Sequence, residues 1–262
     1  MPELPEAEAN RRHIEAEALN RTIRDVELGE VAHLDVPGPN ALARLKGHRF
    51  TEAKRHGKAV FAGSASGPWI AVHLGMTGRL VAYDEGGEPE NPKVIFVFEG
   101  DRRLAFLNTR KLGSLEIVDD PEAHIAEKGL GPDALRIGAE DFAGRVGGGR
   151  GAIKSALMNQ KKIAGIGNIW SDEILFHSDI APMVKGSDLS DDRIGKLFDQ
   201  TGALLSRGVE VNADYGKLPE DWLLHHREDG AGCPRSGCSG TIRKKTVGGR
   251  AAHYCDTHQE AA

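Results

Sequence analysis

From Thr22 to Val118, short apolar stretches alternate with turns made of Gly, Pro and charged residues. Stretches of this length, repeated at this spacing, are typical of the strands of a β-sandwich. We therefore predict a β-sandwich in the N-terminal half, with at least six strands: Ala59–Ala62, Trp69–Leu74, Leu80–Tyr83, Val94–Phe98, Leu104–Leu107 and Ser114–Val118.

Other segments have the apolar spacing of helices. The stretch Glu6–Leu19 predicts a helix with Pro5 near its first turn and with Leu4 and Ile14 available for a core. The polar stretch Asp119–Phe142, which contains Gly and Pro, is interpreted as a connection between domains. Three more helices are predicted beyond it: Ile153–Asn159, Trp170–His177 and Arg193–Arg207.

These patterns together predict an α+β multidomain fold. A chain of 262 residues is long enough for about two domains of ordinary size. We divide it into an N-terminal β-sandwich domain with flanking helices at residues 1–130, a helical domain at 131–225 and a small C-terminal module at 226–262.

All the cysteines lie near the C-terminus, at Cys233, Cys238 and Cys255, and His258 follows the last of them at Cys-x-x-His spacing. Two close ligand pairs can form a tetrahedron around Zn²⁺, whereas an odd number of cysteines does not indicate a disulfide framework. We predict one structural zinc ion. His253 is an alternative fourth ligand, although its strand-like surroundings suit that role less well.

The same module contains a predicted hairpin at Thr241–Arg250, with its bend at Gly248 and Gly249. A site of three cysteines and one histidine leaves no coordination position open for water. The sequence therefore argues against a zinc-dependent hydrolase.

The net charge of −5, from 34 Lys and Arg against 39 Asp and Glu, argues at first against a polyanionic partner. However, 20 of those 34 basic residues lie in four short windows that hold only three acids: Leu42–Lys58, Arg102–Lys111, Arg150–Lys162 and Arg227–Arg250. A fold could gather these windows on one face and bind nucleic acid. The alternative is solvated surface charge without a partner.

Targeting signals are not evident. The longest apolar stretches, such as Val94–Phe98, are far shorter than the roughly 20 residues that a membrane span needs. The acidic start of the chain lacks the apolar segment of a secretory signal. We expect a cytoplasmic protein that does not bind membranes.

The N-terminus offers a reactive group. Removal of Met1 would leave Pro2 with a secondary amine, which attacks aldehyde-level carbon as Schiff-base lysines do. Glu3 stands beside it and could supply a proton. Proline is also common at helix starts, so these residues alone do not establish a reaction.

Five segments in order resemble motifs of the formamidopyrimidine-DNA glycosylase/endonuclease VIII family. They are Met1–Glu8, Arg55–Lys58, His73–Arg79, Ile153–Glu173 and the cysteine-rich end from Cys233. The resemblance extends over nearly the whole chain and implies that 131–225 is a helix–two-turn–helix domain and 226–262 a zinc finger. It also implies a bifunctional enzyme of base excision repair that excises oxidised bases and then cuts the abasic strand.

The resemblance implies a role for each matching residue. Pro2 would attack the sugar C1′, Glu3 would protonate the ring oxygen, and β- and δ-elimination would follow. Lys58 would contact the phosphate of the damaged nucleotide. Glu6 matches a family acid, although it could equally stabilise the first helical turn.

Further phosphate contacts would come from Lys154, Asn168 and Arg250. Asn168 lies in a Gly-Ile-Gly-Asn turn before a helix, where backbone N–H groups favour phosphate, but it could instead be an ordinary N-cap. Met76, Arg110 and Leu112 would fill the gap left by the everted base. The expected partner is double-stranded DNA with damaged bases or abasic sites, bound by a monomer.

The chain departs from the family pattern in three places. Leu112 stands where Phe is usual, the first zinc interval is x4 with His258 as the last ligand, and Ser206–Gly232 is shorter than in the 8-oxoguanine-excising branch. We therefore predict weak dependence on 8-oxoguanine, with activity on ring-opened purines, hydantoins, oxidised pyrimidines or abasic sites. The alternative function is a non-catalytic, damage-binding zinc protein on the same scaffold.

Overall fold

The computed structural model describes residues 2–259, which form two compact units. The first unit holds Pro2 and Glu6–Gly129, and the second holds Glu3–Pro5 and the chain from Leu130 onward. The first helix, α1 (Leu4–Glu17), therefore contributes residues to both units. Across the described residues, every helix is too short or too polar to cross a bilayer.

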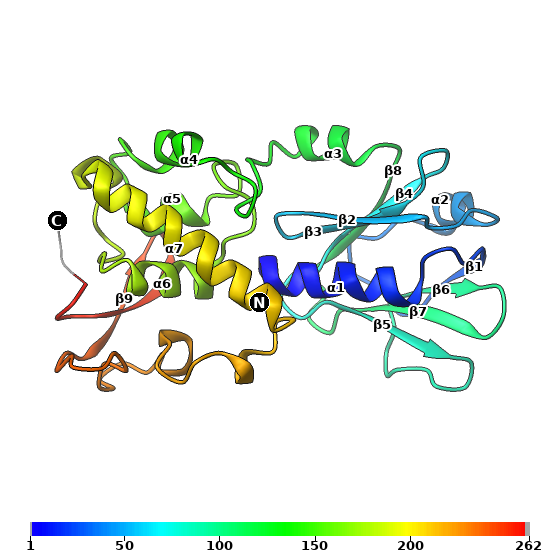
Figure 1. Cartoon of the computed structure of the whole chain (residues 1–262). Coiled ribbons are helices and arrows are strands. Elements are labelled where there is room, and N and C mark those ends of the chain that lie inside the picture. The colour runs from blue at the N-terminus through cyan, green and yellow to red at the C-terminus, as the bar shows by residue number, and fades with distance from the viewer. Residues whose placement is uncertain (1, 260–262) are drawn as a thin grey trace. The chain divides into compact units, whose positions relative to one another are not determined.

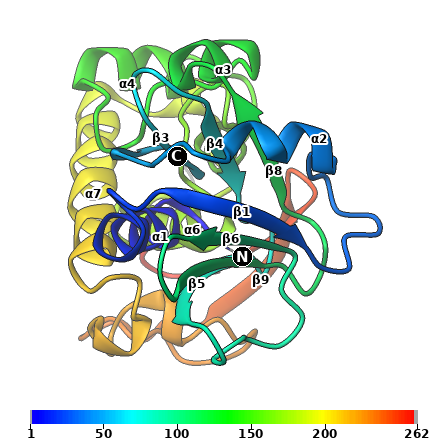
Figure 2. The same cartoon turned by 90° about the vertical axis from the view of Figure 1, so that its right-hand side faces the viewer.

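The first unit is the predicted β-sandwich, with its two antiparallel sheets visible as separate layers in Figure 2. One sheet has the order β1-β6-β7-β5 and the other the order β2-β3-β4-β8. The strands are β1 (Ile23–Leu28), β2 (Glu52–His56), β3 (Ala59–Gly63), β4 (Trp69–His73), β5 (Arg79–Asp84), β6 (Val94–Phe98), β7 (Arg102–Leu107) and β8 (Ser114–Val118). The short helices are α2 (Pro39–Leu42), a 3₁₀ turn (Ala43–Leu45) and α3 (Pro121–Glu127).

The sandwich core follows the period of two that a pleated strand imposes. Phe96 and Phe98 of β6 point to one face, where they pack with Phe50 and with Ile14 of α1. Val97 lies between them and points to the other face of the same sheet, where it belongs to a second apolar cluster. Both faces of β6 are therefore buried, which explains why this strand is apolar throughout.

The second unit is mainly helical (Figure 1). Its helices are α4 (Ala139–Val146), α5 (Ile153–Met158), α6 (Asn168–His177) and α7 (Asp191–Glu210), with 3₁₀ turns at Gly186–Asp188, Tyr215–Lys217 and Leu223–His225. Trp170 and Ile174 of α6 form its centre, and Leu4 packs into the same core. A two-stranded hairpin, β9 (Ile242–Val247) and β10 (Arg250–Cys255), completes the unit.

The predicted connection at Asp119–Phe142 is more structured than expected, because it contains α3 and the start of α4. Asp120 caps α3 by accepting hydrogen bonds from the backbone N–H groups of Glu122 and Ala123, and Pro121 occupies the first turn. Both are helix-start signals present in the sequence. The polar composition of the segment concealed them.

The hairpin bend lies where it was predicted. Gly248 and Gly249 have φ values of +57° and +74°. Two consecutive positive φ angles are what a tight two-residue hairpin turn requires. The second strand continues to Cys255, so the hairpin is longer than the predicted Thr241–Arg250.

Candidate functional site

The side chain of Glu3 lies at the N-terminal end of α6. Its side chain is fully buried, and its carboxylate accepts hydrogen bonds from the backbone N–H groups of Gly167 (2.6 Å), Ile169 (2.8 Å) and Trp170 (3.3 Å). These donors are the free N–H groups of a helix N-terminus, which carries partial positive charge. The fold therefore fixes a carboxylate in a defined place immediately after Pro2.

The turn before α6 is shaped to admit that carboxylate. A Cβ on Gly167 would lie 2.3 Å from the Glu3 carboxyl carbon, so any larger residue would displace Glu3. Gln160 stabilises the turn, because its amide donates to the carbonyl of Ile166 and its oxygen accepts from the N–H of Gly165. Leu4 donates its backbone N–H to the Gly165 carbonyl, which holds the start of α1 against the turn.

Asn168 is not the N-cap of α6. The cap position is Gly167, and the carboxylate of Glu3 provides the hydrogen bonds that a capping side chain would make. Within residues 2–259, the buried Oδ1 atom of Asn168 has no hydrogen-bond partner.

Lys58 lies in the tight turn between β2 and β3. Gly57 has a φ of +55°, and its carbonyl accepts a hydrogen bond of 3.0 Å from the buried guanidinium of Arg55. Arg55 in turn pairs with Glu8 at 3.3 Å. The Lys58 side chain is half-buried and lies close enough to His73 that loss of solvent and the lysine charge together lower the pKa of the histidine.

The three predicted gap-filling residues lie on two adjacent loops. Asn108 is buried and joins the loops, because it donates to the Leu74 carbonyl at 3.2 Å and accepts from the N–H of Leu112 at 3.2 Å. The side chains that these loops present are Met76, half-buried, Arg110, exposed, and Leu112, 55% exposed. Leu112 is the one large apolar side chain of residues 2–259 that is exposed.

Lys154 differs from its expected role. Its side chain is fully buried, and its Nζ bonds to Asp172 Oδ1 at 2.5 Å and donates to the Ala251 carbonyl at 2.9 Å. Burial lowers the pKa of Lys154, and the Asp172 carboxylate opposes that shift. An ammonium without solvent access does not reach a phosphate, so the expectation of a direct contact is wrong for this conformation. Arg250, the first residue of β10, is exposed.

The C-terminal cluster has the geometry of a metal site. The ligand atoms of Cys233, Cys238, Cys255 and His258 all lie within 4.8 Å of one another. His258 Nδ1 lies 3.6 Å from two of the sulfurs, and Cys238 Sγ lies 3.7 Å from Cys255 Sγ. The backbone N–H of Gly240 points to Cys238 Sγ and lowers the pKa of that thiol. This cluster could hold a metal ion.

The structure distinguishes the two histidines that the sequence left open. His258 Nε2 contacts the Phe176 carbonyl at 3.3 Å, an arrangement that leaves Nδ1 free to coordinate. His253 is buried elsewhere, with its Nδ1 3.7 Å from Asp172 Oδ2. The fourth member of the cluster is therefore His258.

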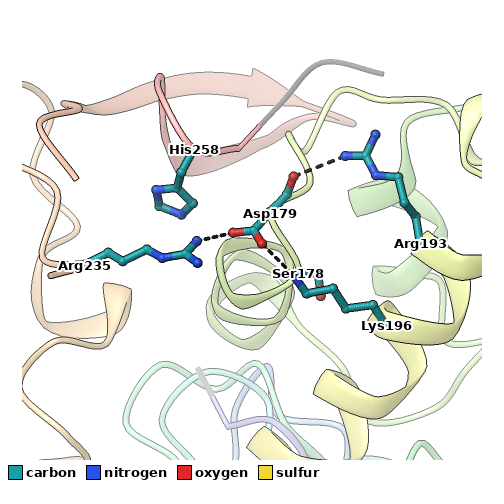
Figure 3. Close-up of a pocket in the computed structure, with 6 residues that line it drawn as sticks. All are labelled: Ser178, Asp179, Arg193, Lys196, Arg235 and His258. Carbon is teal, nitrogen blue, oxygen red and sulfur yellow. Dashed lines mark hydrogen bonds and ion pairs between the residues drawn. The ribbon is translucent and has the colours of Figure 1, made fainter. Parts of the chain in front are cut away.

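Ion pairs attach the loop between Cys233 and Cys238 to the helices. Figure 3 shows Asp179 between Arg235 of that loop and Lys196 of α7, with Arg193 donating to the Asp179 carbonyl at 3.1 Å. A cavity of about 460 Å³ opens beside these residues. Asp179 already neutralises Arg235 and Lys196. We therefore explain this group of charges as an anchor for the loop between Cys233 and Cys238.

Sequence reasoning missed the buried residues that organise this region. Asp172 binds Lys154, Arg227 (2.9 Å) and the backbone N–H of His253 (3.0 Å). One signal was present, because Asp172 follows Asn168 by four residues and so lies on the same helix face. Glu173 is similarly hidden and accepts hydrogen bonds from the backbone N–H groups of Leu223 and Leu224.

Known proteins resemble the chain over nearly its whole length. A family model of the formamidopyrimidine-DNA glycosylase N-terminal domain matches residues 1–115, and one of the formamidopyrimidine-DNA glycosylase H2TH domain matches residues 129–218. The formamidopyrimidine-DNA glycosylase of Solibacter usitatus is 33% identical over 97% of this chain and 98% of its own. That of Cereibacter sphaeroides is 31% identical with the same coverage.

Solved structures agree with these matches. The Lactococcus lactis formamidopyrimidine-DNA glycosylase bound non-covalently to DNA with an AP site gives a TM-score of 0.89 at 25% identity, covering 98% of this chain and 99% of that one. A complex of the same enzyme with DNA containing an oxidised pyrimidine gives 0.87 at 24% identity, covering 99% and 100%. The chain belongs to the formamidopyrimidine-DNA glycosylase family.

Proposed function

We propose that this protein is a base-excision-repair DNA glycosylase that also cuts the abasic strand, with Pro2 as its nucleophile. The observation that carries the proposal is the buried Glu3 carboxylate, fixed by three backbone N–H groups immediately after Pro2 in the chain. A protein that only bound DNA would not need a carboxylate in this place. Met1, whose removal the mechanism requires, lies outside the described residues.

The chemistry follows from a secondary amine beside a carboxylate. The nitrogen of Pro2 forms a bond to C1′ of the damaged nucleotide while the bond from C1′ to the base breaks, and the base leaves with the electron pair and takes up a proton. The proton of the attacking nitrogen passes through Glu3 to the sugar ring oxygen as its bond to C1′ breaks. A positively charged iminium between C1′ and the nitrogen remains.

The iminium then acidifies the C2′ hydrogens. Loss of one proton expels the 3′ phosphate, and a second proton loss expels the 5′ phosphate. Water finally hydrolyses the bond between the sugar fragment and Pro2. The helix N-terminus around Glu3 stabilises the carboxylate each time it has given up its proton.

The phosphates would be held by Lys58, Asn168 and Arg250. Lys58 and Arg250 supply positive charge, and Asn168 lies at a helix N-terminus, a favourable place for phosphate. Met76, Arg110 and Leu112 would replace the everted base in the stack. Leu112 contributes apolar contact in place of ring stacking.

The substrate would be duplex DNA with ring-opened purines, hydantoins, oxidised pyrimidines or abasic sites. The segment between α7 and η4 (Leu223–His225) is compact: Tyr215 accepts a hydrogen bond of 3.0 Å from the indole of the buried Trp170. The shortness of Ser206–Gly232 is the basis for proposing weak dependence on 8-oxoguanine. A kinetic panel of defined lesions tests this, and 8-oxoguanine excision as fast as the best lesion would contradict it.

The metal would be a structural Zn²⁺ held by Cys233, Cys238, Cys255 and His258. Tetrahedral bonds of about 2.3 Å to sulfur and 2.0 Å to nitrogen place sulfurs about 3.8 Å apart and sulfur and nitrogen about 3.5 Å apart. The separations of 3.7 and 3.6 Å fit that geometry. One zinc per chain, retained in His253→Ala and lost in His258→Ala, is the expected metal analysis.

Borohydride trapping on an abasic duplex tests the reaction, because reduction of the iminium leaves a permanent protein–DNA bond. Protein shown by mass spectrometry to begin at Pro2 should be trapped, and Pro2→Gly should give at most a few per cent of that adduct. Failure of correctly processed protein to trap would leave only the damage-binding function. An undiminished adduct in Pro2→Gly would exclude the proline mechanism.

A further inference from the structure

Lys154 of α5 and Asp172 of α6 form a fully buried ion pair that the proposed chemistry does not use. Removing two charges from water is costly, and an apolar pair of similar size would often be as stable. The pair is also not isolated, because Arg227 contacts Asp172 Oδ2 at 2.9 Å. The backbone groups that contact this ion pair indicate its role.

The ion pair faces the free edge of β10. Lys154 Nζ donates to the Ala251 carbonyl at 2.9 Å, and Asp172 Oδ2 accepts from the N–H of His253 at 3.0 Å. In an extended strand, the carbonyl of one residue and the N–H of the second residue after it point to the same side. The strand β9 pairs with β10 along the opposite edge.

The pair therefore presents one donor and one acceptor where a third strand would present its backbone. Buried strand edges without partners are strongly unfavourable, and a hairpin of two strands is only marginally stable alone. The ion pair satisfies the edge and fixes the hairpin in position along α6. Side-chain charge does here what a neighbouring strand does in a larger sheet.

Two residues of the proposed DNA-binding surface lie close in sequence to the groups that the ion pair joins. Arg250 directly precedes Ala251 on β10, and Asn168 lies one helical turn before Asp172 on α6. The hydrogen bonds of the pair thus fix the position of the exposed Arg250 relative to Asn168. Both belong to the second unit.

We propose that Lys154 and Asp172 are positioning residues that act as a surrogate third strand and hold Arg250 and Asn168 in fixed relative positions for contact with DNA phosphates. Lys154 then contributes to DNA binding through the Ala251 carbonyl rather than by touching a phosphate. The part that concerns DNA rests on the proposed function. The part that concerns the hairpin edge does not.

A double-mutant cycle between Lys154→Met and Arg250→Ala tests the DNA part. Lys154→Met leaves Asp172 paired with Arg227, so no buried cation loses its partner. With an abasic-analogue duplex at fixed salt, we expect each single variant to raise Kd about tenfold, the size of one charged contact. The double variant should be at most about twofold weaker than either single one, because both changes remove the same positioned contact.

The matched control is Lys58→Met combined with Arg250→Ala. Lys58 belongs to the other unit, so its effect on Kd should multiply with that of Arg250→Ala. Multiplying effects for Lys154→Met would overturn the proposal, because they would mean an independent contact. An unchanged Kd in Arg250→Ala would overturn it too.

Hydrogen exchange without DNA tests the hairpin part. In Asp172→Asn and Lys154→Met, protection of the β9–β10 amides, His253 above all, should fall at least tenfold while α7 keeps its protection and the zinc content stays at one. Unchanged protection in both variants would overturn the surrogate strand. Failure of the wild-type protein to trap on borohydride would refute the glycosylase reaction but leave the cycle and the exchange result intact.

Discussion

Two basic segments, one in each unit, each bury one cation and pair it with a carboxylate, but the buried cation is a different residue of the motif in each. In β2, Arg55 is the buried cation and pairs with Glu8, while Lys58 in the following turn is half-buried. In α5, Lys154 is itself the buried cation and pairs with Asp172. A lysine in a matching motif thus remains partly exposed in one setting and is fully buried in the other.

The difference arises from local geometry. The positive φ of Gly57 turns the chain sharply, so that Arg55 and Lys58 point to different surroundings. In α5 no such turn intervenes, and Lys154 points between α6 and β10. We therefore expect replacement of Lys58 to affect folding little, and replacement of Lys154 to affect it more.

The largest effect should come from Gly167→Ala in the second unit. Its Cβ would overlap the Glu3 carboxylate, and displacing a reacting group by about 1 Å costs on the order of a hundredfold in rate. Single-turnover excision should fall by about that factor while zinc content is unchanged. Gly202→Ala is the control, because a Cβ there meets open space on α7 and should leave the rate unaltered. Equal rates for the two variants would refute the role of Glu3.

Lys58→Met and Lys154→Met compare the two lysines directly. Lys58→Met should weaken DNA binding about tenfold and reduce the slope of log K against log salt by about one, with the free energy of unfolding unchanged within about 0.5 kcal/mol. Lys154→Met should lower the free energy of unfolding by about 1 to 2 kcal/mol, because it leaves the Ala251 carbonyl without its donor while Asp172 stays paired with Arg227. Urea denaturation and salt titrations measure both. Similar denaturation midpoints for the two variants would contradict the different roles of the two lysines.

A smaller effect is expected for Leu112→Ala. Because this side chain is 55% exposed, its loss should leave the free energy of unfolding within about 0.5 kcal/mol of wild type. Excision from duplex DNA should slow several-fold, since less apolar surface would fill the gap after base eversion. Excision from a lesion in single-stranded DNA is the control and should not change. Equal slowing on both substrates would argue against a role in the gap.

The smallest effect concerns Glu8, the partner of Arg55. Burial alone would raise the pKa of Glu8, but hydrogen bonding and charge from Arg11, with further charge from Arg55 and Arg12, leave the pKa below its ordinary value of 4.5. A lowered pKa stabilises the fold above about pH 4.5, and this contribution is lost as the pH falls through the folded-state pKa. Glu8→Gln should therefore cost about 1 kcal/mol at pH 7 and progressively less in acid. A stability difference between Glu8→Gln and wild type that does not change with pH would contradict the lowered pKa of Glu8.

Much of this protein could be predicted from local patterns. The length and spacing of the apolar stretches predicted the strands of the sandwich, Gly248 and Gly249 predicted the hairpin bend, and the spacing of the cysteines predicted a cluster with metal-site geometry. Each of these depends on residues close together in the chain. Asp120 and Pro121 carried an equally local helix signal, which the polar composition of their segment obscured.

The sequence by itself determined the identity of the reactive groups: an amine that follows Met1, a carboxylate beside it, and thiols and a histidine at ligand spacing. Only the tertiary structure decided which charges face solvent. Glu3 meets the N–H groups of α6 across 164 residues, and Lys154 meets the Ala251 carbonyl across 97. Burial depends on what the rest of the chain packs against a side chain, and no local pattern of residues contains that information.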